Sequence, residues 1–446
     1  MNYNDADLTN RPCKIVKRGS VICVLKTQFS RIINRILFCE VLKMIGTLSG
    51  IVRAVARNRT LWRHGKQVRG YACPPGSMRL HENCLELEYR GTRMHLDYVW
   101  LRDHCRSAES FNIQTHQRNL DTGSIDLNIR PDHVQVEDDD LILTWPGGHT
   151  SKYSLSWLAE NSYEGKKQSV VQPRILWNAD IYKNSHVASS KWDAFMNSED
   201  ELKKFLQNYL LYGIAFVDDV PATIEATEAV TQRVSLIRET TYGRMWSFTS
   251  DFSRGDTAYS QLDLDRHTDT TYFQEPCGIQ VFHCLKHEGT GGRNLLVDGF
   301  YAAKSLRKRS PEDFELLSHV PIKHEYLERT GSHQNHMIGF GPVLNVYPWN
   351  NELYMIRYNN FDRGVINTIP HDVVRRWYAA HRQLTSELRR AENEMWMKLT
   401  PGKVIFIDNW RVMHGREAFT GVRQVCGCYL SRDDILSKSR CLGLQV

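Results

Sequence analysis

The sequence lacks an apolar run long enough to cross a membrane, and it has no internal repeat and no low-complexity tract. A membrane-spanning helix needs about 20 apolar residues, so we expect no membrane span. The eleven cysteines are an odd number, and no two of them form a Cys-x-x-Cys pair. This pattern is typical of reduced intracellular thiols rather than of a disulfide framework.

Outside its first 63 residues the chain also lacks a net positive charge. Residues 1–63 contain twelve of the 57 Lys and Arg residues and three of the 51 acidic ones, which leaves 45 basic and 48 acidic residues elsewhere. A near-neutral folded part does not provide the basic surface that nucleic-acid binding requires. We therefore expect neither a nucleic acid nor a membrane among the partners.

The excess of basic residues lies in a leader over residues 1–65. Its segment 44–65 contains four arginines and no acidic residue. If this segment is helical, Ile51, Val52 and Val55 lie along one side, as in a mitochondrial presequence. We expect import into the mitochondrial matrix, with a disordered basic tail as the alternative.

A small β-rich domain is predicted over residues 79–165. Alternating apolar and polar runs are interrupted at Arg90-Gly91 and again at a Pro-Gly-Gly turn over 146–148, which indicates two hairpins. Residues 106–132 between them are polar, and we expect a long loop there.

A larger domain is predicted over residues 175–446. Many strands and few helices after residue 213 favour a mainly β fold, a sandwich or jelly roll with flanking helices. A doubly wound parallel sheet would require regular alternation of strands and helices. The expected helices are 198–213, 224–240 and 371–390, and the expected strands are 278–286, 293–298, 353–359, 403–408 and 422–430.

A candidate metal site begins at His267 and Asp269. Residues two apart in an extended segment point to the same side, so the two side chains would converge. His414 follows an apolar strand, precedes a glycine and is the best third ligand. Two histidines and one carboxylate leave positions open for a cosubstrate and O2, as in non-heme Fe(II) oxygenases, whereas zinc prefers more protein ligands. The alternatives are a hydrogen-bonded surface pair and a zinc hydrolase on a cupin-like barrel.

A candidate carboxylate-binding residue, Arg423, lies nine positions after His414. Strand alternation places Arg423 on the same face as Val425, Gly427 and Tyr429. An arginine near the metal could hold a carboxylate through two parallel hydrogen bonds, as a dicarboxylate cosubstrate requires. A surface salt bridge is the alternative.

These residues resemble a known family. His267-Thr268-Asp269, the segment DNWRVMHGR (408–416) and Arg423 are similar to the 2-oxoglutarate-dependent dioxygenases. WLRDHC (100–105) and HTDTTYFQEPCGIQVFHCL (267–285) are similar to the carnitine-biosynthesis branch, whose members hydroxylate trimethyllysine or γ-butyrobetaine. The resemblance covers residues 79 to 446.

The resemblance implies a double-stranded β-helix core and a reaction. Fe(II) would be held by His267, Asp269 and His414 as the catalytic ligands, and Arg423 would bind 2-oxoglutarate. Asn294 stands where relatives usually have Thr or Ser beside this cosubstrate. The expected activity is O2-dependent 3-hydroxylation of N6,N6,N6-trimethyllysine, the first step of carnitine biosynthesis, with ascorbate keeping the iron reduced. The alternative is γ-butyrobetaine hydroxylation, the last step.

The family also implies a homodimer and, in some members, a zinc site in the N-terminal domain. The zinc-binding relatives have a cysteine cluster after WLRD, and this chain has only Cys105 there. We therefore predict no structural zinc in this domain.

A substrate site is implied by four aromatic residues that match the cage of the γ-butyrobetaine enzymes. A quaternary ammonium donates no hydrogen bond and is recognised by aromatic faces. Tyr242 and Trp246 would share a face if their segment were helical. A core stripe is the alternative, and a non-catalytic reader of methylated lysine would need the cage alone. The cage positions are Tyr242, Trp246, Tyr259 and Tyr429.

Two polar residues are candidates for the amino-acid end of the substrate. Asp256 falls where the γ-butyrobetaine enzymes have an asparagine, and an acid there would suit the α-ammonium of trimethyllysine. Asn359 is a candidate partner for the α-carboxylate. Both residues could instead be ordinary loop caps.

Overall fold

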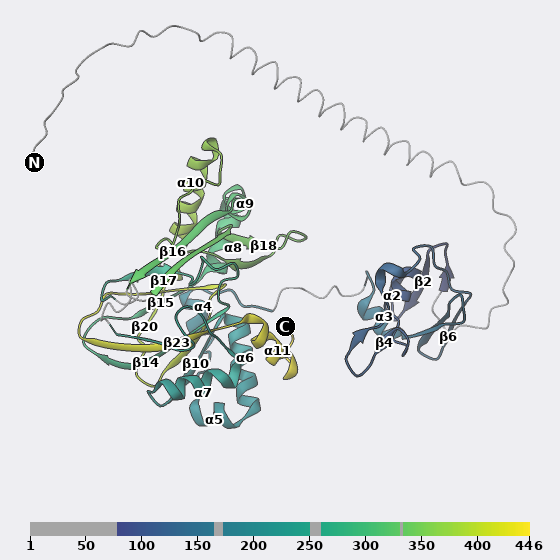
Figure 1. Cartoon of the computed structure of the whole chain (residues 1–446), viewed down its shortest axis with the longest axis horizontal. Coiled ribbons are helices and arrows are strands. Elements are labelled where there is room, and N and C mark those ends of the chain that lie inside the picture. Colours follow the sequence, from purple (N-terminus) through teal and green to yellow (C-terminus); the bar gives the residue numbers. More distant parts are fainter. Residues whose placement is uncertain (1–77, 165–172, 250–259, 331–332) are drawn as a thin grey trace, which may run out of the picture. The chain divides into compact units, whose positions relative to one another are not determined.

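The computed structural model describes residues 78–164, 173–249, 260–330 and 333–446. The basic leader, Asp256 and Tyr259 lie outside these ranges. The chain divides into two compact units, with the boundary between Lys167 and Gln168 (Figure 1). Within the described ranges no helix is both long and apolar enough to cross a membrane.

The described part of the N-terminal unit contains two antiparallel three-stranded sheets around one core, and a two-stranded sheet. Arg90 and Gly91 both have positive φ, at 50° and 80°, which matches the tight turn predicted for the first hairpin. The expected loop over 106–132 contains only very short elements. The strands are β1 (Met78–Leu80), β2 (Cys84–Tyr89), β3 (Thr92–Asp97), β4 (Phe111–Asn112), β5 (Gln117–Arg118), β6 (His133–Glu137), β7 (Asp140–Thr144) and β8 (Thr150–Ser154), and the helices are α2 (Tyr98–Asp103), η1 (Thr122–Ser124) and α3 (Leu155–Asn161).

The C-terminal unit contains two facing β-sheets. The larger sheet has seven strands, of which all neighbours are antiparallel except β9 and β10. In order they are β11 (Ile237–Arg238), β23 (Val422–Leu430), β14 (Ile279–Glu288), β21 (Val404–Asp408), β10 (Ile214–Asp218) and β9 (Ser190–Lys191), with β12 (Trp246–Phe248) also beside β23. The smaller sheet is β13 (Leu264–His267), β22 (Val412–Arg416), β15 (Asn294–Asp298) and β20 (Met395–Met397).

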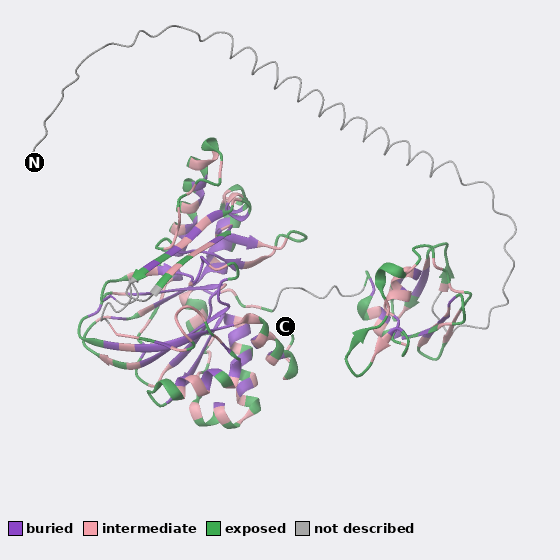
Figure 2. Cartoon of the chain, in the orientation of Figure 1, coloured by how far each residue is buried: buried purple, intermediate pink, exposed green. Residues whose placement is uncertain are grey.

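The space between the two sheets is filled by a core that both of them share. Phe282, Ile405 and Val425 of the larger sheet pack in one cluster with Leu296 and Val412 of the smaller sheet. Buried residues follow the strands of both sheets (Figure 2). The predicted jelly roll is therefore confirmed.

Helices cover the outer face of the larger sheet. Leu202 of α6 and Val230 of α7 pack against Val281 and Phe406 of the sheet. The helices of this layer are α5 (Trp192–Asn197), α6 (Glu199–Tyr212), α7 (Ile224–Val234) and α11 (Arg432–Cys441), whereas α4 (Ala179–Asn184) packs with the core between the sheets. A third cluster joins the smaller sheet to α8 (Gly299–Arg309), α9 (Pro311–His319), β18 (Leu344–Val346), β19 (Leu353–Ile356) and α10 (His371–Leu388). The remaining elements are the hairpin β16 (Ile322–Thr330) and β17 (His333–Gly341) and the short helix η3 (Ala391–Asn393).

The side chains of β23 alternate between the two faces of the larger sheet, as predicted. Cys428 and Leu430 pack in the cluster under the helices, whereas Val425 and Tyr429 pack between the sheets. Arg423 is on the second face and is buried. The pocket described below therefore receives two side chains from one strand.

The predicted helix boundaries are observed for α6 but not for α7. The Ser198 hydroxyl accepts from the Glu201 amide at 3.3 Å, and Gly213 ends α6 with φ 74°. Helix α7 ends at Val234 instead of residue 240, because the following residues pair with β23 as β11. Helices α8, α9 and α11 and the β16–β17 hairpin were not predicted.

Candidate active site

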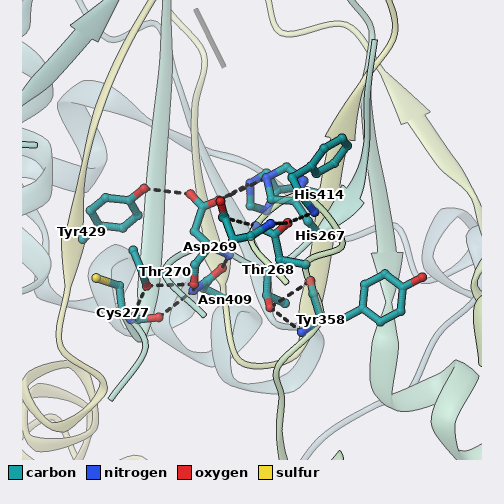
Figure 3. Close-up of polar contacts among 12 residues, drawn as sticks. His267, Thr268, Asp269, Thr270, Cys277, Tyr358, Asn409, His414 and Tyr429 are labelled. Carbon is teal, nitrogen blue, oxygen red and sulfur yellow. Dashed lines mark hydrogen bonds and ion pairs between the residues drawn. The ribbon is translucent and has the colours of Figure 1, made fainter. Parts of the chain in front are cut away.

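Two histidines from adjacent antiparallel strands form the centre of the site. In the pairing of β13 with β22, His267 lies directly opposite His414. Asp269 follows β13 and places Oδ1 3.1 Å from His267 Nε2 and 3.5 Å from His414 Nε2. One ligand atom from each residue lies within 4.8 Å of the others, which is compatible with a single metal ion (Figure 3).

The charges of these three residues are strongly coupled. Burial alone would raise the pKa of Asp269, but the neighbouring His414 and His267 outweigh it and hold this pKa far below its usual range. Burial lowers the pKa of His267, yet the hydrogen bond and charge of Asp269 give a net rise. Burial and the charge of His267 lower the pKa of His414. Metal binding requires the carboxylate in its ionised form and both imidazoles in their neutral form, so the low pKa of Asp269 favours it.

Two of the three ligands, His267 and Asp269, are held by hydrogen bonds outside the triad. His267 Nδ1 donates to the Asp265 carbonyl at 2.8 Å, which leaves Nε2 as the ligand atom. The Asp269 amide donates to Asn409 Oδ1 at 2.7 Å, and Asn409 Nδ2 donates back to the Asp269 carbonyl at 3.0 Å. Asn409 was not identified from the sequence, although it lies within DNWRVMHGR; its only signal is a polar residue directly after an apolar strand.

The residue between the first two ligands points away from the site. The Thr268 amide donates to the Tyr358 carbonyl at 2.7 Å, and the Tyr358 amide donates to Thr268 Oγ1 at 3.0 Å (Figure 3). The alternation expected for an extended His-Thr-Asp segment is therefore observed, and Thr268 anchors the segment to the strand that ends at Ile356.

Tyr429 contacts the triad directly. Its hydroxyl donates to Asp269 Oδ2 at 2.8 Å, on the oxygen that does not face the histidines (Figure 3). Burial, with the charge of Asp269, raises the pKa of Tyr429, so the hydroxyl keeps its proton. Tyr429 thus orients a metal ligand and also forms part of the pocket wall, a combination that the cage motif did not indicate.

The Tyr429→Phe variant separates these two roles. Because phenylalanine keeps the ring but removes the hydrogen bond to Asp269, we expect iron affinity to fall by about 10- to 100-fold, as for other partners of metal ligands. The measurement is an iron titration followed by 2-oxoglutarate turnover. An unchanged iron affinity would show that Tyr429 serves only as an aromatic wall.

A buried arginine lies in the same pocket. Arg423 is 5% exposed, and burial lowers its pKa. Over the described ranges its guanidinium has no hydrogen-bonded or ion-paired partner, and its Cζ lies 5.7 Å from the centroid of the Phe419 ring. A buried cation without a counter-ion favours an anionic ligand such as a carboxylate.

Asn294 and Arg416 form the wall beside Arg423. They are paired across β15 and β22, and both line the pocket. Asn294 Oδ1 is buried and, within the described residues, has no hydrogen-bond partner. Arg416 donates to the Ser260 carbonyl at 2.8 Å. The structure therefore places Asn294 in the pocket, as expected for a residue beside the cosubstrate.

Several aromatic residues line the same pocket. Tyr429 lies between Tyr242 and Trp246, with ring centroids 6.3 and 6.1 Å away. The sequence did not identify Tyr272, which also lines the pocket, nor Tyr326, which stacks on Tyr272 at 4.9 Å. The Tyr242 and Tyr272 hydroxyls are hydrogen-bonded to each other.

The helical arrangement considered for two of these residues is wrong. Trp246 begins strand β12, and Tyr242 lies in the turn closed by the bridge between Thr240 and Gly243. Both rings lie near Tyr429, and Trp246 is placed by its pairing with Gly427 of β23, where a Cβ on the glycine would lie 2.4 Å from the indole. Glycine at 427 is therefore required for this position of the ring.

Asn359 lines the pocket but its amide is already engaged. Asn359 Oδ1 accepts from the amides of Phe361 at 2.8 Å and Asp362 at 3.3 Å. Its Nδ2 donates to Asp362 Oδ2 at 2.7 Å. Asn359 thus forms a loop cap, the alternative stated above, and it places the carboxylate of Asp362 in the pocket, a residue that no sequence signal indicated.

The N-terminal unit contains a separate polar cluster. Cys105 Sγ lies 3.3 Å from His149 Nε2, and His149 Nδ1 lies 2.7 Å from a Glu109 carboxylate oxygen. Burial would raise the pKa of Cys105, but hydrogen bonds from Ser107, Ser151 and His149 lower it to about 6. The absence of a structural zinc here stays a prediction.

Two family models match the chain. Residues 182–429 match the taurine catabolism dioxygenase TauD, TfdA family, and residues 77–159 match the gamma-butyrobetaine hydroxylase-like N-terminal family. Among solved structures, the chain is similar to a taurine dioxygenase from Burkholderia xenovorans (16% identity, TM-score 0.41), over 52% of this chain and 82% of that one.

Curated relatives match over most of the chain. Trimethyllysine dioxygenase, mitochondrial, of Rattus norvegicus is 68% identical over 82% of this chain and 86% of its own length. The Gallus gallus protein of the same name is 67% identical over 82% of this chain and 88% of its own length. Gamma-butyrobetaine dioxygenase of Homo sapiens is 24% identical over 78% of this chain and 91% of its own length.

Proposed function

The chain belongs to the TauD, TfdA family of dioxygenases, and from this premise we propose that it hydroxylates carbon 3 of N6,N6,N6-trimethyllysine. The substrate is favoured by relatives of that name at 67–68% identity, against 24% for the gamma-butyrobetaine enzyme. One oxygen atom of O2 enters the substrate C–H bond, and the other enters succinate as 2-oxoglutarate loses CO2.

The observation that best supports this function is the combination found in one pocket. A metal triad, a buried arginine with no counter-ion among the described residues and several aromatic rings all line it. A reader of methylated lysine would need only the rings. A zinc hydrolase would have no use for the buried cation next to an open metal position.

The residues present fit an Fe(II) ion. Two imidazole nitrogens and one carboxylate oxygen converge, and His267 and Asp269 are each oriented by a hydrogen bond to a neighbour. In our proposal His267, Asp269 and His414 hold the ion. When bound there, Fe(II) would supply the oxidising chemistry with O2, and ascorbate would keep it reduced.

Arg423 and Asn294 bind 2-oxoglutarate in this proposal. The Arg423 guanidinium pairs with the carboxylate at the far end of the cosubstrate, since two parallel hydrogen bonds fix its orientation. Asn294 offers its amide to the same molecule. The burial of Arg423 keeps water away from this ion pair.

The aromatic rings bind the trimethylammonium group. Tyr242, Trp246 and Tyr429 line the pocket, and we assign Tyr259 to the same cage. Asp256 is proposed to contact the α-ammonium and Asn359 to contact the α-carboxylate. The α-ammonium and the α-carboxylate are then held in a fixed direction relative to the triad.

The Trp246→Ala variant tests the cage. Because each good cation–π contact contributes about 0.5–2 kcal/mol, we expect KM for trimethyllysine to rise by roughly 2- to 30-fold. The KM for 2-oxoglutarate should change little. As a control, a neutral analogue with carbon in place of the quaternary nitrogen should bind equally weakly to the unchanged protein and to Trp246→Ala. An equal loss for the neutral analogue would indicate lost packing instead of cation recognition.

The proposed function is tested by 2-oxoglutarate turnover with two substrates. The protein with Fe(II) and ascorbate should release succinate faster with trimethyllysine than with γ-butyrobetaine. Stimulation by γ-butyrobetaine alone would establish γ-butyrobetaine hydroxylation instead. Binding of trimethyllysine without iron-dependent turnover would favour a non-catalytic reader of methylated lysine.

We also propose a location and an organisation. The relatives named above as mitochondrial and the basic composition of residues 1–65 support import into the mitochondrial matrix. The proposed domains are 79–165 and 175–446, and the family matches over residues 77–159 and 182–429 support this division. A homodimer is proposed from the family resemblance.

A further inference from the structure

The metal ligand Asp269 is followed by a strained residue. Thr270 has φ 56°, in the left-handed region that a β-branched side chain rarely adopts. Its Oγ1 donates to the Asp269 carbonyl at 2.8 Å and accepts from the Cys277 amide at 2.8 Å. Such a backbone conformation persists only where the surrounding structure holds it. The contacts that hold the chain after Thr270 therefore also help to determine the position of Asp269.

A buried arginine holds the loop formed by residues 271–274. Arg357 directly follows β19 and is 3% exposed. Its Nη1 donates to the carbonyls of Thr271 at 2.7 Å and Phe273 at 3.0 Å, and its Nη2 donates to the Gln274 carbonyl at 3.2 Å. One side chain thus binds three of the four carbonyls in this loop.

The chemistry of this contact indicates that it fixes a conformation. Among the described residues Arg357 has no acidic partner, and burial lowers its pKa to about 10, so the guanidinium stays charged at neutral pH. A buried charge is costly, and a well-packed apolar residue often gives equal or greater stability. The planar guanidinium, however, can direct several donors at once toward fixed acceptors. Arg357 is therefore suited to holding one loop conformation.

Strand β17 touches the same loop. A Cβ on Gly339 would lie 2.8 Å from the Phe273 carbonyl oxygen and 2.9 Å from the Thr271 carbonyl oxygen. Arg357 Nη1 donates to both of these oxygens. The loop is thus held by a side chain and by the close approach of a strand, and only glycine leaves room for this approach.

The loop connects the metal triad to the aromatic part of the pocket. Tyr272 belongs to the loop and lines the pocket, as does Asp269, which precedes the loop. The Tyr272 ring stacks on Tyr326 of β16 with 4.9 Å between centroids, and its hydroxyl is hydrogen-bonded to that of Tyr242. A shift of the loop would therefore displace both a metal ligand and an aromatic wall.

We infer that Arg357 is a positioning residue for the proposed reaction, because it holds residues 271–274 and thereby fixes Asp269 and Tyr272 in one arrangement. This inference rests on the proposed function and adds a residue to it that lies outside the pocket lining. Without the three hydrogen bonds, Thr270 can relax to a common backbone conformation. Asp269 then moves relative to the two histidines, and Tyr272 moves relative to the pocket.

The test measures ligand affinities of Arg357→Met, which removes the donors and keeps a long unbranched side chain. Iron affinity should fall by about 10-fold, the low end of the range for residues that orient metal ligands. The Kd for trimethyllysine at saturating iron should rise by roughly 2- to 30-fold, because one aromatic contact with the cation is displaced. The Kd for 2-oxoglutarate should change less, since Arg423 and Asn294 lie on other strands. Anaerobic titration calorimetry measures all three without turnover.

Further variants act on the same loop and serve if Arg357→Met does not fold. Arg357→Lys keeps the charge without the planar donors and should recover part of both losses. Gly339→Ala removes no donor but presses on the loop, so it should weaken iron and trimethyllysine binding in the same way. Its combination with Arg357→Met should lose no more than the larger single loss, because both changes release one loop.

Two matched changes at sites away from the loop are the controls. Gly123→Ala adds a Cβ whose nearest atom would lie 3.5 Å away, and Arg376→Met removes an exposed arginine of α10. Both control variants should keep the three affinities of the unchanged protein.

The outcomes separate this inference from the proposed function. Unchanged affinities for iron and trimethyllysine in Arg357→Met and Gly339→Ala overturn the inference. An equal loss of affinity for 2-oxoglutarate also overturns it, because that result indicates general damage to the pocket. Lower iron affinity together with the selective rise in the Kd for trimethyllysine supports it. Absence of trimethyllysine-dependent turnover in the unchanged protein would instead contradict the proposed function, and the effect on iron affinity can be measured independently of that result.

Discussion

Replacement of Asp269 by alanine is expected to abolish trimethyllysine hydroxylation and to lower iron affinity by more than about 100-fold. Removal of a residue that orients a metal ligand already lowers metal affinity by about 10- to 100-fold, so removal of the ligand itself should lower it further. Two imidazoles alone would remain, and the neighbouring Tyr429 hydroxyl would lose its acceptor. Iron titration and succinate release measure the two effects.

The folded state should survive this change. Asn409 contacts only backbone atoms of residue 269, and those hydrogen bonds remain in the alanine variant. The thermal unfolding temperature of the iron-free protein should therefore stay close to that of the unchanged protein. Asp372→Ala is a matched control on an exposed helix turn. Iron-dependent hydroxylation by Asp269→Ala would contradict the assignment of the triad.

Replacement of Arg423 by alanine is expected to raise KM for 2-oxoglutarate by at least about 100-fold. Two charge-assisted hydrogen bonds to one carboxylate contribute about 3 kcal/mol or more. Arg423→Lys should recover part of this loss, because lysine keeps the charge but not the planar pair of donors. The measurement is succinate release as a function of 2-oxoglutarate concentration.

The stability of the Arg423 variant provides an independent check. The described residues offer this guanidinium no ion-paired partner, so its removal breaks no salt bridge among them. Burial of a cation without a counter-ion is costly, so the ligand-free variant should unfold at the same or a higher temperature. Arg376→Ala, on the exposed face of α10, is the control. An unchanged KM for 2-oxoglutarate would show that another group binds its carboxylate.

The sequence predicted those parts of the site that depend on local periodicity. Alternation along an extended segment placed His267 and Asp269 on one side, and it placed Arg423 and Tyr429 on one face of a strand. Both arrangements are observed. Periodicity could not show that His267 and His414 meet, because that contact depends on the register between two strands far apart in the sequence.

The residues that the sequence missed are placed by loops and long-range pairing. Asn409 and Asp362 follow strands at positions where no spacing rule applies, and each is identified only by its partner in space. Helix α7 was predicted too long because local helix propensity cannot foresee that residues 237 and 238 pair with β23. Tyr242 and Trp246 share the pocket through a turn and a strand, not through helical spacing.

The central claim is that this protein adds one oxygen atom to trimethyllysine. Mass spectrometry of trimethyllysine incubated with the protein, Fe(II), 2-oxoglutarate and ascorbate tests it most directly. We predict a product heavier by one oxygen atom, located at carbon 3 by fragmentation and absent with Asp269→Ala. Unmodified trimethyllysine after incubation with the iron-loaded protein would contradict the claim.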